Sequence, residues 1–182
     1  MFKISFGVVF LAFLAGTAIG AEKRIVFGAE SVANGLTYEV GFCARAEDSE
    51  GDGPGHAFVV LQQFDRDGQR IEFLTAGFGP PTSAPVHPDG VISEEKYSHE
   101  SQECLIAVTN EAKYEAIKRG IRNEMEYSFA GETFQLTRPY TVVLDDCVTF
   151  FQSVAKDFGL NVPGRIHGLM PLAYVNELKK AN

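Results

Sequence analysis

Hydrophobic and polar residues alternate in short stretches through the first two thirds of the chain. This pattern predicts strands over residues 24–27, 36–44, 56–64, 69–78 and 104–108. Asp65-Arg66-Asp67-Gly68 lies between the third and fourth stretches, and Asp-Gly is the strongest short signal for a hairpin. With Asp-Gly as the central pair of a type I′ turn, Arg66 faces Gln69. Counting back along the two strands, Thr75 then lies on the same sheet face as His56.

The last third of the chain has helical periodicity instead. The expected helices span residues 110–125, 146–158 and 171–180. The first has an apolar residue at every fourth position from Ile117 to Met125, which predicts a buried face. The second can be capped by Asp145 or Asp146 and ends at Gly159. The third begins with a proline, which suits the first turn of a helix.

The remaining stretches predict loops and short strands. Residues 79–90 hold four prolines and no periodic pattern, so we expect a loop there, and the acidic, glycine-rich stretch 47–54 predicts an exposed loop just before His56. Residues 127–137 predict one or two short strands, and 141–144 a short strand that leads into the second helix. The order of these elements predicts an α+β fold with a largely antiparallel sheet.

The first twenty residues have the pattern of a secretory signal peptide. Lys3 supplies a positive charge, the apolar run over 4–15 is too short to span a bilayer comfortably, and small residues follow it. Cleavage after Gly20 leaves a single domain over 21–182, which is long enough to bury a full core. We therefore expect a secreted or periplasmic protein with no stable membrane insertion after cleavage.

Charge and cysteine content narrow the choice further. The net charge of −8 argues against a nucleic-acid or anionic-membrane partner. The cysteines are Cys43, Cys104 and Cys147, and an odd number leaves one unpaired in an oxidising compartment. A disulfide between Cys43 and Cys104, which lie in expected strands, would leave Cys147 free. The alternative is that all three are buried thiols.

The candidate chemistry lies in a cysteine that opens a helix and a histidine that opens an apolar strand. A thiol at a helix N-terminus, as expected for Cys147, is easier to ionise, and the amides of the first turn can bind an oxyanion. The imidazole of His56 can accept the thiol proton. The opposing interpretation is a buried, inert cysteine and a core histidine. The carboxylates of Asp145 and Asp146 suit the helix dipole but oppose ionisation of a neighbouring thiol.

Other chemistries have less support in the sequence. His87, His99 and His167 are weaker candidates, because they lie in polar, proline-rich or loop-like sequence. The chain has no Cys-x-x-Cys or His-x-x-x-His spacing for a metal, no Gly-x-Ser-x-Gly motif and no glycine-rich phosphate loop. We therefore expect no metal and no cofactor.

The segments Gly55-His56-Ala57-Phe58 and Asp146-Cys147-Val148-Thr149-Phe150-Phe151, in this order, resemble the circularly permuted papain-like hydrolases of the NlpC/P60 superfamily. That superfamily includes proteins similar to lecithin:retinol acyltransferase. The end of the expected strand at Thr75-Ala76-Gly77-Phe78-Gly79-Pro80 is also similar. The resemblance covers about half of the chain after the signal peptide. It implies a papain-like fold in which the sheet packs against the cysteine helix.

The same resemblance implies roles for individual residues. Cys147 is the nucleophile, His56 is the base, and a third polar residue orients the imidazole. Thr75 is the polar residue that the predicted register places on the expected face. The implied substrate is a peptide or acyl compound: peptidoglycan peptide for a bacterial envelope protein, with lipid acyl hydrolysis or transfer as an alternative.

These observations together predict a secreted or periplasmic cysteine hydrolase of the amidase or endopeptidase type. Cys147 attacks the carbonyl carbon, and His56 takes the thiol proton and later protonates the leaving group. The first rival is a non-catalytic envelope binding module that keeps the fold. The second is an inhibitor or immunity-type protein that binds another envelope protein through an exposed apolar patch.

Overall fold

The computed structural model of the chain describes most of the residues after the expected signal peptide. The described residues are 22–27, 35–46, 55–80, 86–95, 102–129, 138–141, 144–165 and 170–182. The predicted signal peptide and the predicted loop over 47–54 lie outside them.

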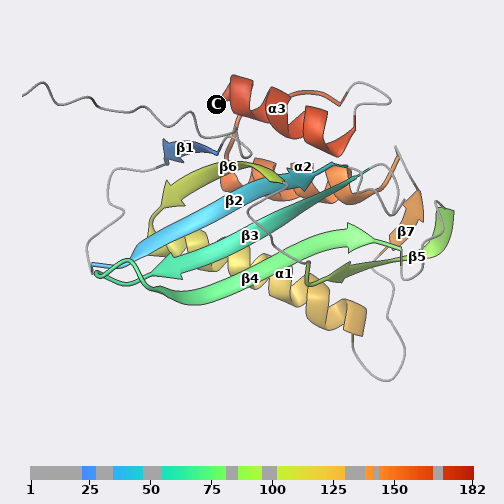
Figure 1. The fold of residues 1–182 in the computed structure, drawn as a ribbon. Coiled ribbons are helices and arrows are strands. Elements are labelled where there is room, and N and C mark those ends of the chain that lie inside the picture. Colours follow the sequence, from blue (N-terminus) through green and yellow to red (C-terminus); the bar gives the residue numbers. More distant parts are fainter. Residues whose placement is uncertain are drawn as a thin grey trace, which may run out of the picture.

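Within the described residues, seven strands come mostly before the helices in the chain, as expected for an α+β fold. The strands are β1 (Lys23–Val26), β2 (Thr37–Arg45), β3 (His56–Phe64), β4 (Arg70–Gly79), β5 (Val86–Ser93), β6 (Gln102–Thr109) and β7 (Arg138–Thr141). They lie in the order β1-β6-β2-β3-β4-β5-β7 (Figure 1). Every neighbouring pair is antiparallel except β1 and β6, which are parallel. The prediction of an α+β fold with a largely antiparallel sheet is therefore confirmed.

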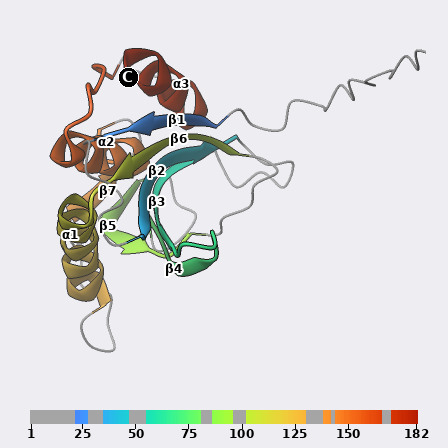
Figure 2. The ribbon, with the colours of Figure 1, turned by 90° about the vertical axis from the view of Figure 1, so that its left-hand side faces the viewer.

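Three helices cover one side of this curved sheet (Figure 2). They are α1 (Glu111–Phe129), α2 (Cys147–Phe158) and α3 (Pro171–Ala181). No helix in the described part of the chain is long and apolar enough to cross a membrane.

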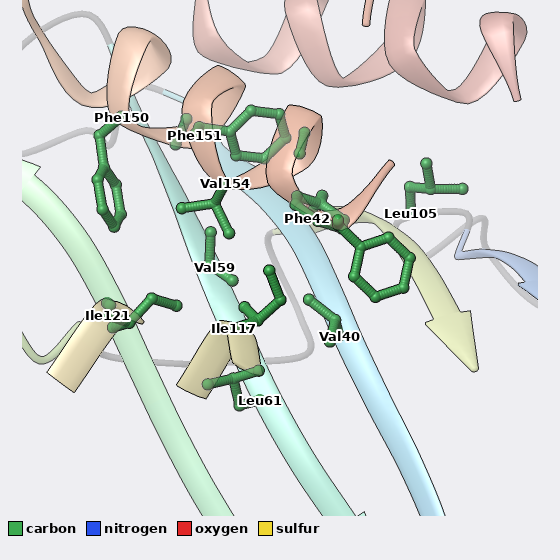
Figure 3. Close-up of a cluster of buried hydrophobic side chains, with 14 of the residues drawn as sticks. Val40, Phe42, Val59, Leu61, Leu105, Ile117, Ile121, Phe150, Phe151 and Val154 are labelled. Atoms are coloured by element: carbon green, nitrogen blue, oxygen red, sulfur yellow. The ribbon is translucent and has the colours of Figure 1, made fainter. Parts of the chain in front are cut away.

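The main core lies between the helices and alternate residues of the central strands. Residues of β2, β3, α1 and α2 that meet there are Val40, Phe42, Val59, Leu61, Ile117, Ile121, Phe151 and Val154 (Figure 3). The Phe42 ring meets Phe151 edge to face, with ring centroids 5.5 Å apart. Each fully buried side chain of this size contributes about 1.5–3 kcal/mol to folding, so this layer holds α2 firmly on the sheet.

The opposite face of the sheet carries a second, smaller buried cluster. Its members are Cys43, Phe58, Val60, Cys104 and Ile106. Cys43 and Cys104 lie opposite each other on β2 and β6 and form a disulfide. The disulfide predicted from the sequence is therefore confirmed, and Cys147 is the free thiol.

The hairpin between β3 and β4 has the predicted register but a different turn. The predicted pairing of Arg66 with Gln69 is wrong, because the Asp65 amide donates to the Gln69 carbonyl oxygen instead (2.9 Å). The Asp65 carboxylate also accepts hydrogen bonds from two amides of the loop and so stabilises this wider turn. A bulge beside the turn compensates for the shift, so that Thr75 lies opposite Val60, as predicted.

Three other predictions are wrong in part. Residues 86–90 belong to β5 and not to a loop. The pairing register of β5 with β7 shifts between His87 and Gly90, because Pro88 has no amide hydrogen to donate. Helix α1 continues to Phe129, so 127–129 are helical and not a strand; the remainder of that predicted region, 130–137, lies outside the described residues. The strand expected over 141–144 lies earlier, in β7.

Candidate active site

Cys147 is the first residue of α2, and the residue before it caps the helix. The Asp146 carboxylate accepts hydrogen bonds from the amides of Val148 (3.0 Å) and Thr149 (3.3 Å), and the Thr149 hydroxyl accepts one from the Asp146 amide (2.7 Å). This reciprocal capping box satisfies amides that an isolated helix start leaves unpaired. The predicted start of the helix is therefore confirmed, with Asp146 as the cap. Gly159 ends the helix with φ 95°.

A buried ion pair neutralises the aspartate that precedes the thiol. Arg165 donates to both carboxylate oxygens of Asp146, at 2.7 and 2.8 Å, and the two side chains are only 12% and 4% exposed. A bidentate pair of this kind is among the strongest polar contacts in proteins. Because Arg165 balances the charge of Asp146, the carboxylate opposes a thiolate at Cys147 much less than the sequence alone indicates.

The imidazole of His56 contacts a carboxylate that the sequence did not single out. His56 is the first residue of β3, and its Nε2 lies 3.0 Å from Oε1 of Glu95, two residues after the end of β5. The other carboxylate oxygen, Oε2, accepts a hydrogen bond from Arg45 at 3.2 Å. The side chains of His56 and Glu95 are only 16% and 13% exposed. Glu95 is therefore the carboxylate that contacts the imidazole of His56.

Thr75 lies on the predicted face, but its hydroxyl contacts the backbone of Glu95 and not the ring of His56. The hydroxyl donates to the Glu95 carbonyl oxygen (2.7 Å) and accepts from the Glu95 amide (2.8 Å). The carboxylate of Glu95, and not Thr75, holds the imidazole. The sequence signal that was missed is the short apolar run that forms the end of β5. Because this strand was not predicted, no predicted strand pairing placed Glu95 beside β4.

The charges of the site are coupled through the imidazole. Burial alone would lower the pKa of His56, but hydrogen bonds to Cys147 and Glu95 and their negative charges raise it to about 9. Burial would likewise raise the pKa of Glu95, but His56 and Arg45 together lower it. At neutral pH the ring is therefore a cation and Glu95 an anion.

The imidazole has two acidic partners. Nε2 of His56 faces Glu95, and the side chain of His56 also forms a hydrogen bond with Cys147. A cationic imidazole beside a thiol stabilises the thiolate, which is the nucleophilic form of cysteine. The site therefore brings a thiol, an imidazole and a carboxylate together. Cys147 itself is 4% exposed.

Tyr140 is a further neighbour of the thiol that sequence reasoning missed. Thr141, the last residue of β7, exchanges two backbone hydrogen bonds with Asp145, which brings the end of β7 close to the start of α2. Burial raises the pKa of Tyr140, and the charges of Cys147 and Asp146 raise it further. Tyr140 is therefore a neutral phenol, and only 8% of the residue is exposed.

Of the other candidates from the sequence, His87 lies in β5, where its backbone pairs with Tyr140. His99 and His167 lie outside the described residues. Among the residues that the structure describes, no group of three or more histidine, cysteine or acidic side chains is arranged to hold a metal ion.

Comparison with solved structures supports the fold class. The structure is similar to the crystal structure of a type VI secretion system effector, TseH, with a TM-score of 0.56 over 82% of this chain and 91% of that chain. The two sequences are 12% identical, so the similarity concerns the fold alone, and it is consistent with a papain-like fold. No protein-family model matches the sequence, and no curated protein matches it. The circular permutation stays a prediction.

Proposed function

We propose that this chain is a cysteine hydrolase of the papain-like type that cleaves an amide bond in a peptide. The observation that carries the proposal is the set of side chains that meet at the site: His56 forms hydrogen bonds with both Cys147 and Glu95. A nucleophile, a base and a third group that orients the base are the parts that covalent catalysis of acyl transfer needs.

Each step of the reaction then has a group to perform it. The Cys147 thiolate attacks the carbonyl carbon, and the His56 imidazolium gives its proton to the leaving amine. Water, deprotonated by the now neutral His56, attacks the thioester, which releases the acyl group as a carboxylic acid and restores the Cys147 thiolate and the His56 imidazolium. Glu95 keeps the ring in place and stabilises its positive charge.

The oxyanion of the intermediate needs hydrogen-bond donors near the thiol. The amides of Val148 and Thr149 already donate to Asp146, so they are occupied. The amide of Cys147 itself, at the positive end of the α2 dipole, is the best remaining backbone donor at this helix start.

The proposed substrate is the peptide of a bacterial cell wall, and the proposed location is outside the cytoplasm. The first follows from the resemblance to NlpC/P60 hydrolases. The second follows from the signal-like N-terminus and from the Cys43–Cys104 disulfide, because disulfides persist in oxidising compartments. Hydrolysis or transfer of a lipid acyl group uses the same intermediate at Cys147 and is the alternative reaction.

The reactivity of Cys147 tests the site without knowledge of the substrate. Iodoacetamide should alkylate Cys147 at neutral pH faster than it alkylates a free cysteine, as followed by intact mass. Cys147→Ala should abolish labelling, and His56→Ala and Glu95→Gln should slow it by about tenfold or more. Glu103→Gln is a matched control, because Glu103 is paired with Lys179 away from the site. A Cys147 that reacts no faster than free cysteine, unchanged by these variants, would refute the proposal.

The reaction itself is tested with purified peptidoglycan fragments. Mass spectrometry should show new amine and carboxylate ends with the wild-type protein and none with Cys147→Ala. Acyl esters of lipids, incubated in parallel, distinguish the alternative reaction.

The burial of Cys147 favours a second candidate, a binding module that keeps the fold without turnover. Only 4% of the residue is exposed, so a substrate reaches the sulfur only after neighbouring groups move aside. A binding module would retain peptidoglycan fragments in a pull-down with both the wild-type protein and Cys147→Ala, and would release no products with either.

A further inference from the structure

Two residues of β4 lie directly beneath the contact between His56 and Glu95. In the β3–β4 register Gly77 lies opposite Phe58 and Thr75 opposite Val60, so both share the sheet face of His56. The ladder between β4 and β5 ends where Gly77 pairs with Ser93. Glu95 therefore comes after the last paired residue, and the ordinary β ladder no longer fixes its position.

The side chain of Thr75 replaces that missing part of the ladder. Its hydroxyl donates to the Glu95 carbonyl oxygen at 2.7 Å and accepts from the Glu95 amide at 2.8 Å. One side chain thus satisfies both backbone groups of Glu95, and Thr75 is 4% exposed, so that water competes poorly for these bonds. The carboxylate of Glu95 is therefore attached to a backbone whose position is fixed.

Gly77 provides the space in which the carboxylate and the imidazole meet. A Cβ at Gly77 would lie 2.6 Å from Oε1 of Glu95 and closer still to Nε2 of His56, and real Cβ contacts are essentially never under 3.0 Å. These two atoms are the ones that form the hydrogen bond. Any side chain at this position would therefore have to push apart the pair itself. Gly79, two residues further along β4, has no atom within 4 Å of such a Cβ.

We infer that Thr75 and Gly77 are positioning residues for the His56–Glu95 pair. Thr75 fixes the backbone of Glu95, and Gly77 leaves empty the volume in which Oε1 and Nε2 come together. The consequence for catalysis rests on the proposed function, because the pair orients the base only if Cys147 is a nucleophile. The geometric claim stands independently of any substrate.

The test measures the titration of His56 by NMR together with the alkylation rate of Cys147. The His56 ring signal is identified by its loss in His56→Ala, since the chain has four histidines. Gly77→Ala and Thr75→Val should each lower the midpoint of the His56 titration from about 9 by about one pH unit or more, because the carboxylate moves away. Alkylation at neutral pH should slow by about tenfold or more.

Two further variants serve as controls for these changes. Gly79→Ala adds the same methyl group to the same strand and should leave the titration and the alkylation rate as in the wild type. Thr75→Ser keeps the hydroxyl and should retain most of both, which separates the hydrogen bonds from packing. Thermal unfolding shows which variants are folded, and Thr75→Val decides the inference if Gly77→Ala does not fold.

The result that overturns the inference is a folded Gly77→Ala or Thr75→Val protein whose His56 titrates as in the wild type. A wild-type His56 that titrates near 6.5 would overturn it as well. Failure of the proposed function gives a different result: no substrate is cleaved, while the titration of His56 still responds to these variants.

Discussion

His56 stands between a thiol and a carboxylate, so the charge on one ring decides the state of the whole site. The ring is held on both sides by acidic partners, and Arg45 pairs with the outer oxygen of Glu95. Arg45 and His56 therefore bind different oxygens of the same carboxylate and together lower its pKa.

The pH dependence of stability follows from these coupled charges. The pKa of His56 is raised from 6.5 to about 9, so its contribution to stability is complete below pH 6.5 and is lost as the pH rises through about 9. The pKa of Glu95 is lowered from 4.5, so its contribution is present above pH 4.5 and is lost as the pH falls further. Both contributions are therefore complete between pH 4.5 and 6.5.

Glu95→Gln should remove the acidic part of this pH dependence and weaken the alkaline part, because Cys147 also raises the pKa of His56. The amide keeps the shape of the side chain but not its charge, and the lost charge-assisted hydrogen bond is expected to cost about 2 kcal/mol at pH 6. Urea unfolding of the wild type and the variant from pH 3 to 10 measures the difference. A difference that stays constant over this range would show that Glu95 and His56 are not coupled.

At the scale of the elements, the position of the nucleophile depends on how α2 begins. One aspartate both caps the helix and pairs with Arg165, which follows α2 by several residues. The ion pair thereby ties the segment after the helix back to its first turn. Removing one partner leaves the other charge buried without compensation.

Arg165→Met should therefore be strongly destabilising, by about 3–5 kcal/mol, as is usual when one partner of a buried ion pair is lost. Alkylation of Cys147 should slow as well, because the unbalanced charge of Asp146 then opposes the thiolate. Lys180→Met is a matched control: Lys180 pairs with Glu177 on the surface, and its loss should cost at most about 1 kcal/mol. Equal thermal unfolding of the two variants would contradict this prediction.

The elements with strong local signals were predictable from the sequence. Helix α2 has an aspartate cap and a glycine end, and β3 has the predicted bounds, His56–Phe64. The register of the hairpin was also predictable, although its turn was not, since a bulge compensated for the different loop. These features depend on residues that are neighbours in the chain.

Strand β5 was not predictable, and the carboxylate of the site was missed with it. The prolines around β5 indicate a loop, but pairing with β4 and β7 on its two sides makes a strand of residues 86–93. The β7 partner is distant in the chain, so no local pattern reports that pairing. Thr75 was placed on the correct face, but its bonds to Glu95 could not be foreseen without β5.

At the scale of the whole molecule, one covalent bond joins distant parts of the chain. Cys43 and Cys104 are 61 residues apart in the chain and link the neighbouring strands β2 and β6. In the chain-entropy description, a bond that closes a loop of this length stabilises the fold by about 4 kcal/mol. The site at the start of β3 is built on the strand next to this bond.

Cys43→Ala/Cys104→Ala should lower the free energy of unfolding by about 2–5 kcal/mol, as measured in urea. The wild-type protein, denatured without reductant, should present a single titratable thiol, and Cys147→Ala should present none. Two or three thiols per wild-type chain would show that the disulfide is not formed in the protein.

The sheet also keeps two kinds of sulfur apart. The disulfide belongs to the cluster on one face, and the thiol of Cys147 belongs to the core on the other. Thiol–disulfide exchange requires a thiolate to attack a bonded sulfur directly, and the sheet lies between the two clusters that hold these sulfurs. A free cysteine can therefore coexist with an oxidised pair in the same small protein, because the fold keeps its sulfur from exchanging with that pair.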